Sequence, residues 1–367
     1  MTRMTGTVLV VGSVPLPSAE MVFRTCTREL GPYVFAYPDG EVGNRRYWTF
    51  YLASTTYANH PDLESVDVPA SGLVMKPGRG TTEDEINRTW WRFQLGKGVE
   101  TPVFDDLHYA EVASESYAVF TQLRDEQVIP AEARFQVSLP ATGSAIMPFF
   151  ARSTEWPVLY DAYRLAMRRE VQRIVDAIPP RDLVIQWDIA TEVRDILAGS
   201  SLLFPWAPRV AIDEKWRWHL RDFEELSADL PEEACLGYHF CFGTWGGWPH
   251  STAADMSVCV RFANEAVARA GRRVDYLHMP VMPDAGEAFF APLRQLRVGE
   301  TRAYLGIVLG DGAEAFQRRA IEARRYIPKF GIASYCGWGR EDSTRLPSLL
   351  TDLRECAERF STMDMAA

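Results

Sequence analysis

The segment His239-Phe240-Cys241 places an imidazole and a thiol two residues apart at the end of a short apolar run that begins at Cys235. On an extended strand, side chains two residues apart point to the same side of the backbone. A glycine-rich turn, Gly243 to Gly247, follows directly. An imidazole and a thiolate on one side of a strand form half of a metal site. The alternative is that both residues simply fill a buried core.

The composition sets broad limits on the protein. It has 367 residues, of which 47% are hydrophobic, enough for two ordinary domains or one large barrel. The net charge of −10 does not favour binding to a nucleic acid or to an anionic membrane. We expect a cytoplasmic protein, because no stretch approaches about 18 uninterrupted apolar residues and the N-terminus has no adequate signal-peptide core. The 6 cysteines are then better candidates for thiols or metal ligands than for a disulfide framework.

Short apolar runs alternate with amphipathic helical patterns along nearly the whole chain. The predicted strands cover residues 7–12, 33–38, 134–138, 183–188, 235–240, 274–278, 303–309 and 331–336. An eightfold alternation of strand and helix is typical of a (β/α)₈ TIM barrel, an α/β fold that we predict as a single domain over residues 1–367. A doubly wound open sheet is the alternative, but no G-x-G-x-x-G follows the first strand, which disfavours its dinucleotide-binding form.

The alternation is interrupted once, after the second strand. Residues 51–133 are too long for a single strand-helix unit. They include a polar stretch from Lys76 to Thr82, the aromatic residues Trp90, Trp91 and Phe93, and an expected helix over residues 107–123. We interpret this segment as an insertion over one face of the barrel, because it is too short to form a core of its own.

Candidate metal ligands lie at the ends of the predicted strands. In a (β/α)₈ barrel the reactive groups come from the C-terminal ends of several strands. His239 and Cys241 end the fifth strand, His278 ends the sixth and Cys336 ends the eighth. Two thiolates and two imidazoles form a plausible tetrahedral site for Zn²⁺. A closed structural zinc site and a metal-free core are the alternatives.

Further polar residues lie at the C-terminal ends of the predicted strands, as the candidate metal ligands do. Gly12-Ser13 ends the first strand, Asp39-Gly40-Glu41 follows the second, and Asp188 ends the fourth. An ordinary salt bridge with Arg45 or Arg46 is the alternative to a binding role for Glu41 and Asp188. Several tryptophans could form an aromatic lid or fill the core: Trp90, Trp91, Trp245 and Trp248.

Taken in chain order, these motifs resemble the catalytic domain of cobalamin-independent methionine synthase and the wider group of uroporphyrinogen-decarboxylase/methionine-synthase-like barrels. The motifs are Gly12-Ser13, Asp39-Gly40-Glu41 with Asn44-Arg45, Ile185 to Asp188, His239 to Cys241, and Tyr335-Cys336-Gly337. The resemblance covers nearly the whole chain apart from the insertion. It implies that His239, Cys241 and Cys336 match zinc ligands of the family. It also implies that Gly12, Ser13, Glu41 and Asp188 match positions that hold the amino-acid thiol substrate.

The chain departs from this family in three ways. The synthases have a glutamate where this chain has His278, so the implied ligand set is more positive and a stronger Lewis acid. At the seventh strand they carry an aspartate and a histidine, whereas this chain has Asp311 without a histidine, so we expect Asp311 to be the proton donor. The synthases also have a folate-binding N-terminal half without a counterpart here, so the resemblance implies a carbon donor other than polyglutamyl folate.

The expected function is zinc-dependent transfer of a methyl or other alkyl group to or from a small-molecule thiol. Glu41 and Asp188 would hold an ammonium or hydroxyl group of the substrate, and Asp39, Arg45 and Trp245 complete the expected binding site. The alternative is a lyase or decarboxylase, metal-free or zinc-assisted, acting on a small aromatic or carboxylic substrate through Asp39 and Arg45 or Arg46. A non-enzymatic binding protein is a third hypothesis. We expect neither a nucleic-acid nor a membrane partner, and the sequence leaves the oligomeric state open.

Overall fold

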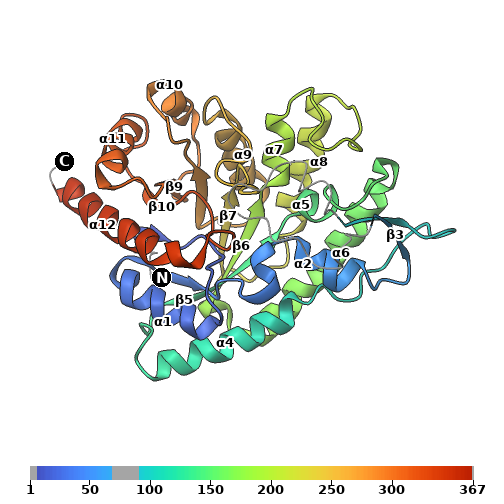
Figure 1. Ribbon diagram of the computed structural model, residues 1–367, viewed down its shortest axis with the longest axis horizontal. Coiled ribbons are helices and arrows are strands. Elements are labelled where there is room, and N and C mark those ends of the chain that lie inside the picture. The colour runs from blue at the N-terminus through green and yellow to red at the C-terminus, as the bar shows by residue number, and fades with distance from the viewer. Residues whose placement is uncertain (1–5, 68–90, 366–367) are drawn as a thin grey trace.

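The chain forms an eight-stranded parallel barrel in a computed structural model that describes residues 6–67 and 91–365. The order of the strands around the sheet is β1-β10-β9-β8-β7-β6-β5-β2. A parallel bridge between Val8 in β1 and Val34, just before β2, joins the two ends of the sheet. Helices between the strands form a ring around the barrel (Figure 1). The predicted (β/α)₈ fold is therefore confirmed.

Each predicted strand coincides with an observed one. The strands of the barrel are β1 (Val8–Leu9), β2 (Ala36–Pro38), β5 (Arg134–Pro140), β6 (Leu183–Ile189), β7 (Cys235–Phe240), β8 (Tyr276–Pro280), β9 (Arg302–Val308) and β10 (Gly331–Ser334). The largest difference is at β1, which is shorter than the predicted range 7–12 because the chain leaves the sheet after Leu9.

The outer ring consists of amphipathic helices. Its long members are α1 (Ala19–Leu30), α4 (Tyr109–Asp125), α6 (Trp156–Ala177), α8 (Ile212–Glu225), α9 (Ser257–Arg269), α11 (Ala313–Arg324) and α12 (Leu346–Met365). Shorter helices are α2 (Phe50–Leu52), α5 (Thr142–Ile146), α7 (Thr191–Leu197) and α10 (Glu287–Phe290). In α1, for example, Val22, Cys26 and Leu30 recur at four-residue spacing and are fully buried, which fixes the face turned to the barrel.

The segment after β2 contains both an insertion and a regular barrel helix. Strands β3 (Leu63–Asp67) and β4 (Arg92–Leu95) form a separate antiparallel pair. Helix α4 packs against α1 and α6, so it is the barrel helix between β2 and β5, and the insertion is shorter than the predicted range 51–133. Trp91 contacts Phe93 with the two rings tilted by 30° and their centroids 5.6 Å apart. The stretch from Lys76 to Thr82 and Trp90 lie outside the described residues.

The interior of the barrel is filled below the site. A buried apolar layer closes the N-terminal end of the strands and includes Leu9, Phe35, Val184, Cys235 and Tyr304. Above it lies a polar layer in which Gln186 Nε2 donates to the Val11 carbonyl at 2.7 Å and to Asp188 Oδ1 at 2.9 Å. Tyr276 donates its hydroxyl hydrogen to Gln186 Oε1 at 2.9 Å. These hydrogen bonds satisfy the buried amide and connect the core to the acidic residue above it.

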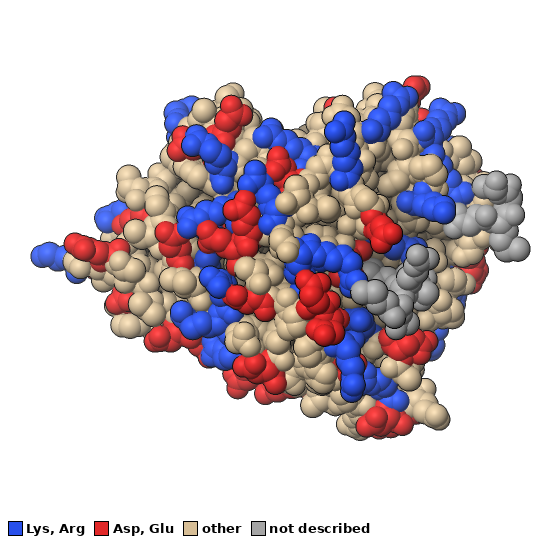
Figure 2. Space-filling view, turned by 180° about the vertical axis from the view of Figure 1, so that it is seen from behind, with Lys and Arg blue, Asp and Glu red and all other residues tan. Residues whose placement is uncertain are grey.

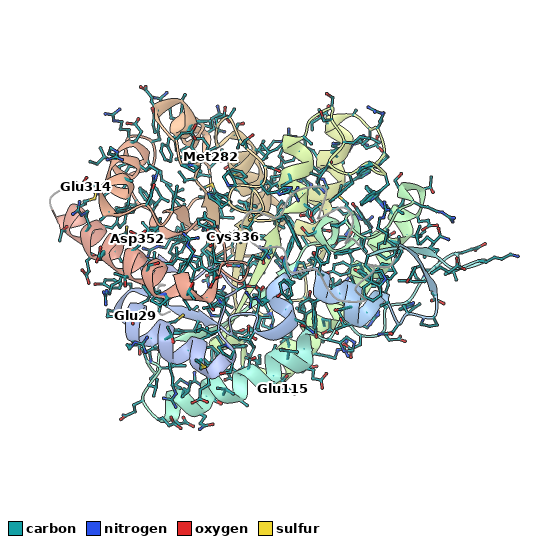
Figure 3. All side chains as sticks on the ribbon, in the orientation of Figure 1. Glu29, Glu115, Met282, Glu314, Cys336 and Asp352 are labelled. Carbon is teal, nitrogen blue, oxygen red and sulfur yellow. The ribbon has the colours of Figure 1, made fainter. Side chains whose placement is uncertain are left out.

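The outer surface carries charges of both signs. On the face seen in Figure 2, basic and acidic side chains are intermixed over the tan background. Glu29, Glu115 and Glu314 lie on the surrounding helices, whereas Cys336 lies near the middle of the barrel (Figure 3). None of the described helices is both long and apolar enough to cross a membrane.

Candidate metal centre

Three of the predicted ligands converge at the C-terminal mouth of the barrel. The Sγ atoms of Cys241 and Cys336 are 3.4 Å apart, and Cys336 Sγ lies 3.6 Å from His239 Nε2. All ligand atoms of the group lie within 4.8 Å of one another, and all three residues are buried. One imidazole nitrogen and two sulfurs at such spacing match the ligand preference of zinc. The residues therefore fit a metal ion of this kind.

The backbone explains how these residues meet. His239 and Cys241 alternate with the outward-facing Phe240 at the end of β7, and Cys336 follows β10. After Cys336 the chain packs directly on the loop that follows β1. A Cβ atom at Gly337 would lie 2.5 Å from Ser13 Oγ, so only glycine fits at this position. The Trp338 backbone N–H donates to the Ser13 carbonyl at 2.6 Å, which fixes the loop that carries Cys336.

His278 lies behind His239 rather than beside the thiols. The Nδ1 atoms of the two rings are 2.6 Å apart, and His278 Nε2 lies 3.0 Å from the Ser334 carbonyl oxygen. Both ring nitrogens of His278 are therefore engaged, and the described metal-binding group does not include it. The register explains this position, because His278 pairs with His239 in the sheet and so lies in the layer below Cys241. This geometry does not support the prediction of His278 as a fourth ligand.

The hydrogen bonds define which nitrogen of His239 is available. A carbonyl oxygen can only accept, so His278 Nε2 carries the hydrogen toward Ser334. Burial, together with the neighbouring His239, lowers the pKa of His278 well below its usual value, so this ring is neutral and its Nδ1 accepts. His239 Nδ1 is then the donor, which leaves the lone pair of Nε2 directed toward the thiols. Such an outer partner is typical of a metal-binding histidine.

The two thiols differ in acidity. Hydrogen bonding with Cys336 lowers the pKa of Cys241, and the Gly243 backbone N–H, 3.3 Å from its Sγ, acts in the same direction. The pKa of Cys336 is raised well above its usual value by the hydrogen bond with Cys241 and by burial. Burial lowers the pKa of His239, but the interactions with Cys336 outweigh it and raise the pKa overall. Cys241 is therefore the thiol that loses its proton first.

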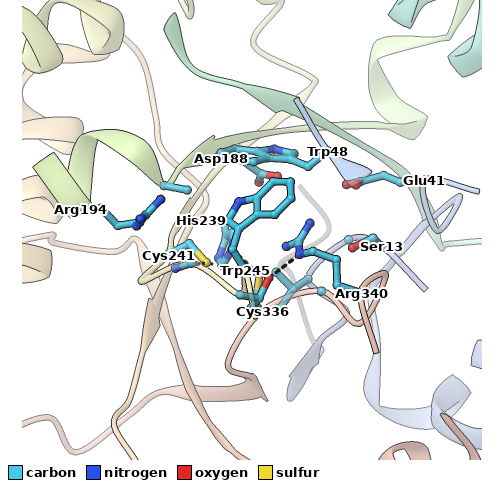
Figure 4. Close-up of a pocket in the computed structure, with 16 residues that line it drawn as sticks. Ser13, Glu41, Trp48, Asp188, Arg194, His239, Cys241, Trp245, Cys336 and Arg340 are labelled. Atoms are coloured by element: carbon cyan, nitrogen blue, oxygen red, sulfur yellow. Dashed lines mark hydrogen bonds between the residues drawn. The ribbon is translucent and has the colours of Figure 1, made fainter. Parts of the chain in front are cut away.

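The metal-binding group opens into a pocket with a volume of about 490 Å³, measured out to its mouth. Five of the residues predicted to bind substrate line this pocket: Gly12, Ser13, Glu41, Asp188 and Trp245. Figure 4 shows Trp245 in front of His239, with Asp188 and Glu41 on one side of the cavity.

The two carboxyl groups of the pocket are deeply buried. Burial raises the pKa of Glu41 to about 8, although Arg45 opposes this rise. Burial likewise raises the pKa of Asp188 to about 8, against the opposing effect of His239. Glu41 has a positive φ of 48° and follows Gly40, whose φ is 80°, so a left-handed turn directs its side chain toward Gly12. Near neutral pH both groups hold a proton that a bound ligand can accept or displace.

Asp39 and Arg45 support this turn from outside the pocket. Arg45 Nη2 donates to Asp39 Oδ2 at 2.6 Å, and the Ser116 hydroxyl donates to the same oxygen at 2.9 Å. The other oxygen, Asp39 Oδ1, accepts from the backbone N–H of Glu41 at 2.9 Å. Neither Asp39 nor Arg45 is among the lining residues, so the structure gives them a positioning contact rather than the predicted contact with substrate.

Asp311 lies away from the site. Both of its carboxylate oxygens accept from Arg319 on α11, at 2.7 Å and 2.6 Å. Its side chain is 41% exposed and does not line the pocket. The prediction of Asp311 as a proton donor is not supported, because the first turns of α11 hold this carboxylate outside the barrel.

The structure adds pocket residues that were not predicted. Trp48, Arg194, Thr244 and Arg340 line the cavity beside the metal-binding group. Arg340 follows β10 in the same loop as Cys336, so its nearness to a strand end was a usable signal. Arg194 lies on α7, and no spacing in the sequence distinguishes it from the arginines of the outer helices.

Fold and site together define a (β/α)₈ barrel with a His/Cys/Cys group at the C-terminal ends of its strands. The fold is shared with a B12-independent methionine synthase from Shewanella sp. W3-18-1, solved in complex with selenomethionine. That match has a TM-score of 0.66 and 12% identity and covers 99% of this chain and 100% of that one. A putative vitamin-B12-independent methionine synthase from Listeria monocytogenes matches with a TM-score of 0.54 and 12% identity, over 93% and 86% of the two chains.

These likenesses confirm, at the level of the fold, the resemblance to the methionine synthase barrel. No protein-family profile matches the chain, and no curated protein matches its sequence.

Proposed function

We propose that the protein is a zinc-dependent transferase that moves a methyl or other alkyl group to or from a thiol. The observation that carries this proposal is the convergence of His239, Cys241 and Cys336 on a pocket that also contains Glu41 and Asp188. A closed structural zinc site has four protein ligands, whereas three ligands beside a cavity leave room for a substrate.

The residues around the candidate metal site would have different roles. His239 Nε2 and the sulfurs of Cys241 and Cys336 would hold the ion. His278 keeps the His239 ring in the required orientation through the Nδ1 contact at 2.6 Å. When bound, zinc would lower the pKa of a substrate thiol and stabilise it as the thiolate, which is the nucleophilic form.

The two pocket carboxyl groups have a separate task. Glu41 and Asp188 would bind a polar group of the substrate, such as an ammonium or a hydroxyl. A cationic group between them would favour their ionised forms. With pKa values of about 8, either carboxyl can also give a proton to a leaving group near neutral pH. They replace Asp311 in this role.

The aromatic residues of the pocket limit access of water. Trp245 is buried and contacts Phe50, with ring centroids 4.5 Å apart, so its ring is fixed above the metal-binding group. Trp48 lines the same cavity. A drier cavity strengthens the attraction between the charged groups and the substrate.

No observation favours the lyase or decarboxylase alternative. That mechanism uses Asp39 and Arg45 or Arg46 on the substrate. Asp39 and Arg45 bind each other outside the pocket, and Arg46 Nε donates to the Gly339 carbonyl at 2.8 Å.

Metal analysis of the purified protein tests the proposal directly. We expect about one zinc ion per chain, lost in Cys241→Ser and in Cys336→Ser with the fold retained. Cys235→Ala is the matched control, because Cys235 is a buried cysteine at the opposite end of the same strand, β7. Zinc-free protein that turns over its substrate at the full rate would overturn the proposal.

A further inference from the structure

Arg340 is held at the mouth of the metal-binding pocket by two contacts. Its Nε donates to Thr244 Oγ1 at 2.6 Å, and its guanidinium carbon lies 5.7 Å from the centroid of the Trp245 ring. Thr244 and Trp245 belong to the loop after β7, which also carries Cys241, whereas Arg340 belongs to the loop after β10. The guanidinium therefore joins the two loops that supply the sulfur ligands.

The outer half of this guanidinium is available for a ligand. Among the described residues, Nη1 and Nη2 of Arg340 donate to no protein acceptor. The adjacent carboxylate, Glu341, accepts instead from the Tyr335 hydroxyl at 2.6 Å and from Arg345. Asp39 is bound to Arg45. A half-buried arginine with its terminal nitrogens directed to a cavity is suited to two parallel hydrogen bonds with an anion.

The charge of the pocket agrees with this assignment. Arg194, which is 8% exposed, lines the opposite side of the cavity, and its Nε donates to Ser251 Oγ at 3.0 Å. Figure 4 shows Arg194 and Arg340 on either side of His239 and Trp245. Burial shifts the two lining carboxyl groups, Glu41 and Asp188, toward their neutral forms. Two guanidinium groups therefore border the cavity in a chain whose net charge is −10.

Arg340 also stands between two cavities. A second, smaller hollow, about 250 Å³ when the open solvent at its mouth is counted, is lined by Trp248 and Tyr335 and shares Thr244, Gly337 and Arg340 with the first. An anionic group bound at Arg340 could therefore belong to a molecule in either cavity.

We propose that Arg340 binds a carboxylate or sulfonate group of the substrate. The inference rests on the proposed function for the placement of the reacting sulfur at the metal centre, and it adds that one of the two reactants is an anion. The anion is carried either by the thiol in the first pocket or by the carbon donor that extends into the second.

Cobalt-loaded protein tests whether the thiol carries the anion, because thiolate coordination to Co²⁺ gives a charge-transfer absorption band. The probes are 3-mercaptopropionate and 2-mercaptoethanesulfonate, compared with the neutral 3-mercaptopropionamide and 2-mercaptoethanol. We expect the anionic thiols to bind at least about 10-fold more tightly, as one charge-assisted contact of about 1.5 kcal/mol implies. Arg340→Gln should abolish this preference without weakening the neutral thiols, and Arg340→Lys should restore part of it.

Calorimetry tests whether the carbon donor carries the anion. Propionate and propane-1-sulfonate are titrated into protein saturated with 2-mercaptoethanol, with propionamide as the neutral control. If the wild-type protein binds these anions and the Arg340→Gln variant does not, the anionic group belongs to the carbon donor. Arg325→Gln, which removes the same charge from the exposed end of α11, is the control in both experiments. Thermal unfolding of each variant shows that the fold is retained.

The possible outcomes separate the two proposals. If no thiol gives a charge-transfer band but metal-free protein still binds propionate through Arg340, the anion site stands and the proposed function fails. If thiols bind cobalt and Arg340→Gln changes anion affinity in neither experiment, the proposed function stands and the anion site is wrong.

Discussion

The Nδ1 atoms of His239 and His278 lie 2.6 Å apart, and the far nitrogen of His278 donates to the Ser334 carbonyl in β10. A chain of hydrogen bonds thus runs from β10 through β8 to His239, the candidate metal ligand on β7. Gly306 leaves room for it, because a Cβ atom there would lie 2.8 Å from His278 Nε2. His278 therefore contacts His239 and lies outside the His239, Cys241 and Cys336 group.

We therefore predict that His278→Phe weakens zinc binding without abolishing it. The substitution removes the acceptor that fixes the His239 tautomer, and loss of such a partner typically lowers metal affinity about 10- to 100-fold. Titration with a competing chelator measures the change, with Cys235→Ala as the control. Complete loss of zinc, equal to that in Cys241→Ser, would show instead that His278 is itself a ligand.

Asp39→Asn should weaken substrate binding while leaving zinc content unchanged. Asp39 accepts from the Glu41 backbone and from Arg45, so the variant loosens the turn that presents the Glu41 carboxyl. We expect thiol affinity to fall about 10-fold, the effect of one lost charge-assisted contact. Zinc analysis and thiol titration of the same preparation separate the two effects. A loss of zinc would contradict the positioning role.

The stability of the metal-free protein should fall as the pH rises from about 5 to 8, in part because of Glu41. Its pKa in the folded protein is about 8, compared with a usual value of 4.5, so the folded chain retains a proton that the unfolded chain releases. The stabilisation is complete below the unfolded pKa and is lost as the pH approaches 8, with a slope of at most about 1.4 kcal/mol per pH unit.

Glu41→Gln should flatten this pH dependence, because glutamine does not titrate. Urea unfolding of metal-free protein at pH 5, 6, 7 and 8 provides the measurement, with Glu115→Gln on the exposed face of α4 as the control. Parallel curves for the wild type and Glu41→Gln would contradict the assignment.

Asp222→Ala should strongly destabilise the barrel wall. Arg164 Nε donates to Asp222 Oδ1 at 2.7 Å, and both side chains are almost fully buried, with 4% and 3% exposed. The backbone N–H of Thr142 also donates to this carboxylate, at 2.8 Å. Removing it leaves the buried guanidinium with only longer contacts to Asp161, at 3.4 Å, and Glu225, at 3.7 Å, so we expect a loss of about 3 kcal/mol.

Urea unfolding measures this loss, and Asp229→Ala provides the comparison, because Asp229 pairs with Arg168 and the two side chains are 43% and 42% exposed. We expect a change within about 0.5 kcal/mol for the control. Equal effects of the two substitutions would show that burial does not determine the contribution of Asp222.

The barrel could be predicted from the sequence because its strands are buried on both faces and separated by amphipathic helices. The same two-residue alternation placed His239 and Cys241 on one side of β7. The alternation could not predict how far along the barrel axis each side chain lies, because that position depends on the register between neighbouring strands. His278 faces the interior as predicted, but it pairs with His239 and lies below the sulfurs.

The loops that follow the strands were less predictable. Asp311 follows β9 closely, yet Arg319, two turns into α11, binds its carboxylate outside the pocket. No helical or strand periodicity surrounds Arg340 in the sequence. Its position depends on a hydrogen bond with Thr244, which lies 96 residues earlier in the chain. Side chains in such loops are positioned by tertiary contacts rather than by local spacing.

The packing of Gly337 on Ser13 leads us to expect a particular order of folding and metal binding. Cys336 reaches its partners only when the loop after β10 rests on the loop after β1, and β1 pairs directly with β10. Among the described strands β10 is the last, so we expect the three candidate ligands to come together only after β10 has joined the barrel beside β1. Zinc uptake would thus follow closure of the barrel, and the ion would be acquired by a finished protein rather than by a folding intermediate.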